Sequence, residues 1–293
     1  MKKIFIVLLC LLVCGCAKND NNDDVFVLDE HRSFFTNNSF TFNKGTYEIQ
    51  DGLLMFKDKK TSKYAMVSNE PNNVALDDSN PAYVGPMSSV FVNNNILYTI
   101  KKDMSNNNIK IEKSNLDRTN IKTLFNGDGT QIANLIKVKD ILYFFISSPV
   151  TKLDETTGLT VYTNDGQSQL MCLDLQTDKV YKCDIIESGL NVEAMVFGSN
   201  DYELYYSVSS IKDDDYFIQF KKCNISDFKP VTVLEIEKER ASGSFIDGSD
   251  IYYQILNNDN SISYYVYSMS SDTHKKLDNS REIMEWFENN GKS

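Results

Sequence analysis

A cysteine near the start of the chain carries the clearest chemical signal. The residues Val13-Cys14-Gly15-Cys16 follow a basic start at Lys2-Lys3 and an apolar run, Ile4–Val13. A basic start, an apolar core and small residues before a cleavage point are the parts of an export signal. An aliphatic residue three positions before a cysteine, with glycine directly before it, is typical of a bacterial lipoprotein signal. We therefore predict that residues 1–15 are removed and that Cys16 receives lipid, including palmitate.

Two other interpretations of this segment stay open. The apolar run is too short for a transmembrane helix, which needs about 20 residues; it would otherwise be an ordinary secretory signal or a buried first strand. Cys14 is disfavoured as the lipid site because the bulky Val13 precedes it. Residues 16–32 are expected to be the lipidated N-terminus and a disordered tether, since 18–24 contain no apolar residue. The predicted location is the cell membrane, lipid-anchored and facing the extracellular side.

Three other segments have residue types that suit chemistry, and none has the full pattern. Ser209-Ser210-Ile211-Lys212 matches the S-x-x-K string of penicillin-interacting enzymes, but no Lys-Thr-Gly partner follows. Residues 126–130 begin like a calcium loop, but Gln131 and Lys137 stand where glycine and glutamate are needed. The carboxylates of Asp213-Asp214-Asp215 point to different sides of an extended chain. We therefore assign no catalytic residue, no metal ligand and no cofactor.

Histidine and cysteine are scarce beyond the signal. His31 and His274 are the two histidines, so a histidine-based metal site or a Ser-His triad is not expected. Cys172 and Cys183 flank a turn and would lie on facing strands, where they would form one disulfide or, as we favour, remain small buried hydrophobic residues. With Cys223 the count is odd, which excludes a full disulfide framework.

The charge of the chain limits its partners. The formal net charge is −11 over 293 residues. An acidic surface repels phosphate backbones and anionic headgroups, so we expect no nucleic-acid partner and membrane attachment through the lipid alone. The length allows a sizeable core near the upper size of a single domain.

The elements that would position any site are short strands. A polar turn followed by a tyrosine-bearing strand recurs about every 50 residues, the spacing of a repeat with four strands per unit. The tyrosines are Tyr47, Tyr98, Tyr143, Tyr205 and Tyr252. Tyr, Phe, Ile and Val suit half-buried strands, and Asn, Asp and Gly suit the turns between them. This pattern predicts an all-β fold, a β-propeller of about five four-stranded blades.

The blades are assigned to residues 33–279. Their predicted bounds are Ser39–Ser68, Met87–Asn126, Ile132–Ile186, Val192–Ile236 and Ser242–Asp278. A two-sheet sandwich and a β-solenoid are the alternatives, but a sandwich needs no such period and solenoid coils are shorter. Residues 280–293 are predicted to be a C-terminal helix and tail, with Ser280 as its cap and Ile283, Met284 and Phe287 on one side.

The first repeat also carries a resemblance. Together with the lipidation signal and the acidic tether, the stretch Leu53–Thr61 resembles a family of uncharacterised Gram-positive lipoproteins with a propeller distantly similar to YWTD and TolB-type repeats. In that family the first blade ends in a leucine–cysteine pair and a short Cys/His-containing stretch. The matching stretch here, Met66–Asn72, has neither residue, so a disulfide or metal role is not carried over. The resemblance implies the fold and no established activity.

The function expected from these observations is binding. We predict a monomeric, non-catalytic propeller that binds a protein, peptide or glycan at the cell envelope, with ligand-binding residues that the sequence does not identify. The longest insertion, Ser147–Gln167, is where contacts are expected, because loops on rigid scaffolds commonly carry function. The alternative is an extracellular carbohydrate-active hydrolase or lyase, since 41 acidic residues allow many carboxylate pairs of the kind glycosidases use.

Overall fold

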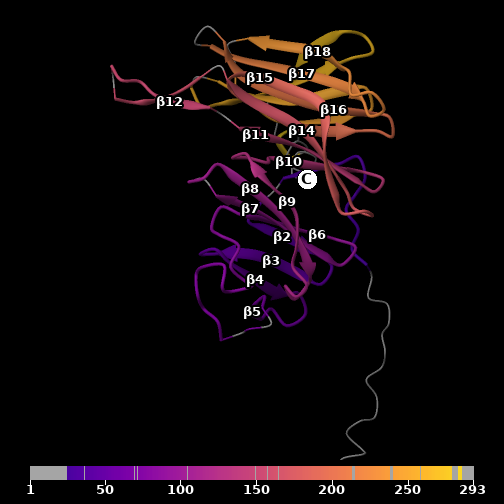
Figure 1. The fold of residues 1–293 in the computed structure, drawn as a ribbon. Helices are drawn as coiled ribbons and strands as arrows, with labels where there is room; N and C mark the ends of the chain where they lie inside the picture. Colours follow the sequence, from indigo (N-terminus) through magenta and orange to yellow (C-terminus); the bar gives the residue numbers. More distant parts are fainter. Residues whose placement is uncertain are drawn as a thin grey trace, which may run out of the picture.

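Antiparallel strands are the main secondary structure of the described residues. The structure is a computed structural model that describes residues 25–278 and 283–285, except residues 36, 69, 71, 104, 149, 157, 164, 213–214, 238–239 and 258. The lipidation signal around Cys16 lies outside the described residues. The strands form five groups of four, each an antiparallel meander, and the groups follow one another along the chain (Figure 1).

The first, second and fifth groups are separate four-stranded sheets. The first contains β2 (Ser39–Phe42), β3 (Gly45–Gln50), β4 (Leu53–Asp58) and β5 (Tyr64–Met66). The second contains β6 (Ser89–Asn93), β7 (Ile96–Asp103), β8 (Asn108–Asn115) and β9 (Lys122–Asp128). The fifth contains β19 (Arg240–Asp247), β20 (Asp250–Leu256), β21 (Ile262–Ser268) and β22 (Thr273–Lys276).

The third and fourth groups share one long strand. β15 (Lys179–Ser199) pairs with β14 up to Gly189 and with β16 from Leu190 onward. Asn191, with φ of 50°, lies where the strand changes partner. The third group is β10 (Asn134–Val138), β11 (Ile141–Ser148), β14 (Gly166–Asp174) and the first half of β15. The fourth is the second half of β15, β16 (Glu203–Lys212), β17 (Asp215–Asn224) and β18 (Pro230–Glu237).

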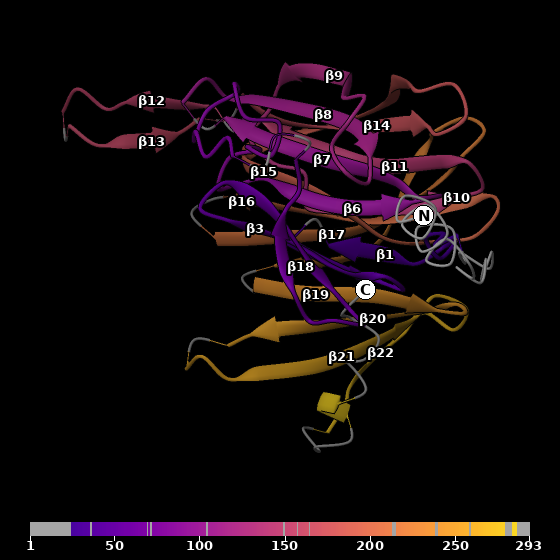
Figure 2. The ribbon, with the colours of Figure 1, turned by 90° about the horizontal axis from the view of Figure 1, so that it is seen from below.

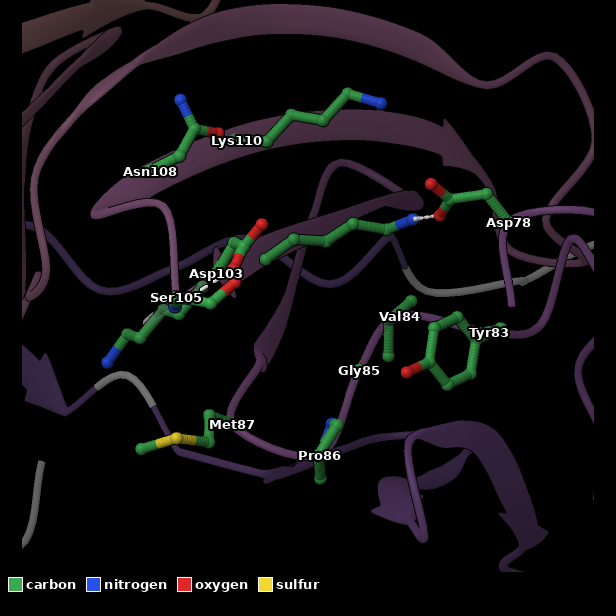
Figure 3. A pocket seen from close by; sticks show the side chains of 12 residues that line it. Asp78, Tyr83, Val84, Gly85, Pro86, Met87, Asp103, Ser105, Asn108 and Lys110 are labelled. Atoms are coloured by element: carbon green, nitrogen blue, oxygen red, sulfur yellow. Dashed lines mark hydrogen bonds and ion pairs between the residues drawn. The ribbon is translucent and has the colours of Figure 1, made fainter. Parts of the chain in front are cut away.

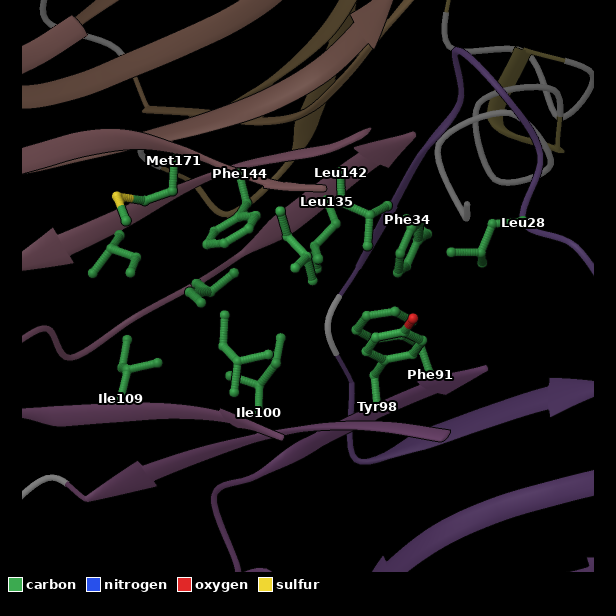
Figure 4. Packing of buried hydrophobic residues seen from close by; sticks show 14 residues of the cluster. Leu28, Phe34, Phe91, Tyr98, Ile100, Ile109, Leu135, Leu142, Phe144 and Met171 are labelled. Carbon is green, nitrogen blue, oxygen red and sulfur yellow. The ribbon is translucent and has the colours of Figure 1, made fainter. Parts of the chain in front are cut away.

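Each pair of neighbouring groups encloses its own hydrophobic core. The core between the second and third groups sets Tyr98, Ile100 and Ile109 against Leu142 and Phe144 (Figure 4). Equivalent clusters lie between the first and second groups, between the third and fourth, and between the fourth and fifth. Because both faces of the inner sheets are buried, their strands contain almost continuous apolar sequences, such as Leu142 to Ile146 in β11.

The tyrosine repeat predicted from the sequence is confirmed, because the five tyrosines occupy the same position in their groups. Each tyrosine is the third residue of the second strand in its group: β3, β7, β11, β16 and β20. The preceding residue faces the previous group and the tyrosine faces the next: Leu142 lies in the core toward the second group, and Tyr143 lies in the core toward the fourth. One dipeptide therefore contributes to two consecutive cores, because successive side chains in a strand point to opposite faces.

The connections define two ends of the array. We call "insertion face" the end with the β7–β8, β11–β14 and β16–β17 connections, where the β12–β13 hairpin projects (Figures 1 and 2). The opposite end, with the β6–β7, β10–β11 and β15–β16 turns, is called the "N-terminal face". Residues with positive φ make several of these turns, including Asn94 (50°), Asn95 (56°) and Lys139 (54°).

Part of residues 25–32, which we expected to belong to the tether, packs against the sheets. Leu28 is buried and its amide donates to Asn93, and the amide of Asn94 donates to the carbonyl of Phe26. β1 (Ser33–Phe35) then pairs antiparallel with β10. Among the described residues, packing against the sheets therefore already includes Phe26 and Leu28, before residue 33, where we expected the packed domain to start.

The last group is covered on its outer face by the C-terminal segment. Residues 283–285 are helical, and Ile283 and Leu277 pack against Phe245 and Tyr264. This agrees with the predicted position of a short C-terminal helix. The predicted cap, Ser280, and the residues from Trp286 onward lie outside the described part of the chain.

Candidate functional site

The sequence motifs weighed for chemistry are not assembled into active sites. Ser209 and Lys212 are three residues apart on β16, so their side chains point to opposite faces. The Lys212 ammonium lies 5.3 Å from the centre of the Phe217 ring, a cation–π contact that occupies it structurally. The S-x-x-K string is therefore part of an ordinary strand.

The calcium-like segment is also part of a sheet. Residues 126–128 end β9, and Asp128 pairs with Asn108 of β8. The amide of Gly129 donates to the carbonyl of Asn107. Across the described residues no group of three His, Cys, Asp or Glu side chains is arranged to hold a metal ion. Asp215 begins β17, and its two acidic neighbours lie outside the described residues.

The structure brings His31 beside a serine and a carboxylate, which sequence reasoning did not foresee. Its Nδ1 lies 3.1 Å from Ser199 Oγ, and its Nε2 lies 3.6 Å from Asp201. Ser199 is buried at the end of β15 and does not line the adjacent 300 Å³ cavity. The arrangement attaches the N-terminal segment to the fourth group, and no signal in the sequence links these three positions.

The expected ligand loop is a projecting hairpin. Within residues 147–167, β12 (Thr151–Leu153) pairs only with β13 (Thr160–Tyr162) in the described structure. Leu153 and Leu159 are exposed on it. The hairpin supplies surface at the insertion face but encloses no cavity among those described.

A cavity of 510 Å³ lies at the same face, beside the second group (Figure 3). One wall is the β7–β8 pair with Lys101, Lys102 and Lys110, and the other is the segment 83–87, which precedes β6. We call this cavity the cationic pocket. Two carboxylates, Asp78 and Asp103, also line it.

A buried carboxylate explains why two lysines can stand side by side. Lys101 and Lys110 are direct cross-strand partners, an arrangement that by itself is repulsive. Glu112 lies 3.8 Å from the Lys101 ammonium and 2.6 Å from that of Lys110. Arg118 adds a third cation at 2.9 Å. Three cations thus share one carboxylate, and the wall keeps a net positive charge.

Arg118 is held in place from three sides. Its guanidinium donates to Glu112, to Thr99 Oγ1 at 3.2 Å and to the carbonyl of Pro81 at 3.1 Å. Its side chain is 1% exposed and that of Glu112 is 3% exposed. Burial raises the pKa of Glu112, but the hydrogen bonds from Lys110 and Arg118 outweigh it and leave the pKa below its usual range. Glu112 is therefore ionised and fixes the positions of its three partners.

Lys102 is the group best suited to meet a ligand. Burial lowers the pKa of its ammonium, and among the described residues no carboxylate forms an ion pair with it. Asp103, its neighbour, accepts hydrogen bonds from Ser105 and Asn106 instead. Lys101 lies 3.8 Å from the shared Glu112 and 3.2 Å from Asp78, whose side chain is 88% exposed. A partly buried cation without a counter-ion favours an anion from outside.

A second, smaller cavity lies at the insertion face of the fourth group. It measures 250 Å³ and is lined by Glu193, Ser209 and Tyr216. Burial raises the pKa of Glu193. A single carboxyl beside hydroxyl groups can hydrogen-bond a polar ligand. Among the described residues no second carboxylate lines this cavity, whereas glycoside cleavage needs two facing carboxylates.

The described residues contain no helix of the length and apolarity needed to cross a membrane. Compared by sequence, the chain matches no protein-family model and no curated protein.

Similar solved structures establish the type of fold. An oligogalacturonate lyase in complex with manganese has a TM-score of 0.50 and 11% identity, over 82% of this chain and 64% of that chain. A puromycin-hydrolyzing peptidase of Mycobacterium tuberculosis has 0.52 and 10%, over 86% and 39%. Oligopeptidase B of Trypanosoma brucei has 0.50 and 12%, over 91% and 37%. The chain spans less than two thirds of each of them, and at these identities the likeness concerns the fold alone: a nearly all-β architecture like that of propeller-type proteins.

Proposed function

We propose that this protein is a lipid-anchored propeller of five blades that binds an anionic peptide or glycan in the cationic pocket at the cell envelope. The observation that carries the proposal is that Lys101, Lys102 and Lys110 all line one cavity in a chain of net charge −11. Lys101 and Lys110 share one face of the β7–β8 pair, and Lys102 leaves β7 on the other face. A general charge excess for solubility would not place three lysines together against the sign of the whole molecule.

The pocket is built to hold its charge in a defined place. Glu112 and Arg118 are buried and mutually bonded, so Lys101 and Lys110 are positioned before a ligand arrives. Preorganised cations lose less side-chain entropy on binding than free surface lysines do. Tyr83, Pro86 and Met87 on the other wall add apolar contact area, which suits a sugar ring or a peptide side chain.

The proposed anchor and the pocket lie at opposite ends of the array. The described chain begins at the N-terminal face, where Phe26 and Leu28 contact the β6–β7 turn, whereas the pocket opens at the insertion face. If Cys16 carries lipid, the residues between it and Val25 span at most roughly 30 Å when extended. This arrangement directs the N-terminal face to the membrane and the pocket away from it.

The binding proposal is tested with Lys102→Gln. We expect affinity for an oligoglutamate peptide or a uronic acid oligosaccharide to fall about 3- to 30-fold, the effect of one charge at close range near a protein surface. Isothermal titration at low salt, with a neutral oligosaccharide for comparison, measures the change. Thermal stability should stay the same or rise, because Lys102 has no ion pair to lose among the described residues.

Lys229→Gln is the matched control. It removes the same charge from an exposed lysine at the N-terminal face, so a general electrostatic effect would weaken binding equally in both variants. Equal effects, or no binding of either anionic probe by the unchanged protein, would refute the pocket. Cleavage of a probe by the unchanged protein, lost after one carboxylate-to-amide change, would replace the binding module with a hydrolase or lyase.

The anchor is tested separately. In a Gram-positive host the protein should partition with membranes and incorporate a fatty-acid probe, and Cys16→Ala should abolish the labelling. Labelling that persists in Cys16→Ala, or release of the unchanged protein into the medium, would contradict lipidation.

A further inference from the structure

The three cysteines of the described chain meet in one place, in the core between the third and fourth groups. Cys183 and Cys223 are buried members of that core, and Cys172 packs against it. All three lie close enough to Tyr143 to influence its hydroxyl electrostatically. They come from three strands, β14, β15 and β17, so the sequence separation of Cys223 hides its proximity to the other two.

Two of these cysteines are neighbours on one face of the β14–β15 pair. Cys172 pairs in register with Tyr181, and Cys183 lies two residues further on β15, so both side chains are on the same face of the pair. Each thiol is the largest single influence on the pKa of the other, so the two sulfurs lie within interaction range. Residues at such diagonal positions face the same space beside the two strands.

The two thiols have different environments. Cys172 is partly exposed, whereas Cys183 is buried. The Cys183 thiol lowers the pKa of Cys172, and the backbone amide of Tyr181 acts in the same direction. The thiolate is the attacking form of cysteine, so Cys172 is both the more accessible and the more reactive member.

We propose that Cys172 and Cys183 are a redox-active pair that closes into a disulfide in the folded protein on exposure to a low-molecular-weight disulfide. The Cys172 thiolate attacks one sulfur of the oxidant, forms a mixed disulfide and releases one thiolate of the oxidant. Cys183 then loses its proton to solvent and attacks the Cys172 sulfur, which expels the second thiolate. Two protein thiols are oxidised and one oxidant disulfide is reduced to two thiols. The bridge joins β14 to β15 and leaves Cys223 reduced.

Tryptic mapping of the full chain tests the proposal, because the cysteines fall in different peptides. Cleavage after Lys152, Lys179, Lys182 and Lys212 places Cys172 in 153–179 and Cys183 in 183–212, and Cys223 begins a third peptide. After treatment of the folded protein with glutathione disulfide and blocking of free thiols, we expect a cross-linked 153–179/183–212 pair and a blocked Cys223. The N-terminal cysteines fall in a separate peptide, 4–18.

Single variants give the order of the steps. Cys183→Ser should accumulate glutathione on Cys172, Cys172→Ser should leave Cys183 unmodified, and Cys223→Ser should form the bridge as the unchanged protein does. The proposal is overturned if Cys172 and Cys183 are both alkylated after oxidation, or if the unchanged protein stops at glutathione on Cys172. It is also overturned if Cys223 reacts as fast as Cys172, since that would show reaction through an unfolded state.

Discussion

Replacing Glu112 by glutamine should lower stability and tighten anion binding in the same variant. Glu112 and Arg118 are almost fully buried and 2.9 Å apart. Removing one partner of a buried pair leaves an uncompensated charge and costs about 3–5 kcal/mol. Glutamine keeps the shape and one acceptor for Arg118, so we expect the lower end, about 3 kcal/mol. For a domain of this size that corresponds to a melting temperature lower by roughly 6–12 °C.

The same change removes a negative charge from behind the cationic pocket. Lys101 and Lys110 lose their shared counter-ion, and an anion about 8 Å away would gain about 0.5–2 kcal/mol at an effective dielectric constant between those of water and the protein surface. The dissociation constant for the anionic probe should therefore fall roughly 2- to 30-fold. Differential scanning calorimetry and isothermal titration measure the two effects, and Glu237→Gln, an exposed position on β18, is the control.

The stability that Glu112 contributes should decrease as the pH falls. The pKa of Glu112 lies below its ordinary value of 4.5, so its ionised form contributes stability above about pH 4.5, and this contribution is lost as the pH falls through the folded-state pKa. The stability gap between the unchanged protein and Glu112→Gln should narrow in acid. A gap that is constant from pH 7 to pH 3, or weaker anion binding by Glu112→Gln, would refute the reasoning about the pocket.

Two further changes test the packing of the groups. In Gly198→Ala the new methyl would overlap the Cγ2 of Ile246, which lies across the interface between the fourth and fifth groups. The free energy of unfolding, measured by denaturant titration, should fall by about 1–3 kcal/mol. The losses from Gly198→Ala and Ile246→Ala should be less than additive in the double variant. Deleting residues 154–165 and closing the gap with a short glycine turn should leave the melting temperature almost unchanged, because the β12–β13 hairpin pairs only with itself in the described structure and loop length costs about 0.6 kcal/mol per doubling. A shift of several degrees would show that the hairpin belongs to the cooperative core.

The repeat and its strands were readable from the sequence because their causes are local. A strand with two buried faces needs an apolar residue at nearly every position, and the turns need residues that tolerate positive φ. Apolar pairs such as Leu97-Tyr98 and Leu142-Tyr143, each shortly after a polar turn, meet both requirements within a few residues. The predicted segments therefore agree with the observed groups within a few residues.

The start of the packed region was not readable in the same way. Residues 25–28 are all apolar and residues 29–32 are all polar or charged, so the segment has no alternating strand period. They are held by single long-range contacts, such as Lys137 with Glu30 at 3.0 Å and His31 with Ser199 at 3.1 Å. Contacts of this kind depend on which turns lie together at the N-terminal face, and the local composition does not encode that.

The sequence by itself therefore determined the class of fold, the order of the repeats and the chemical pattern at Cys16. Only the tertiary structure decided where charge and sulfur gather. Lys101 and Lys110 become neighbours through strand register, Arg118 folds back from a turn onto Glu112, and Cys223 reaches the other two cysteines across a core. The physical reason is that period and turn chemistry act between adjacent residues, whereas a pocket is formed by side chains whose distance is fixed only when the sheets pack face to face.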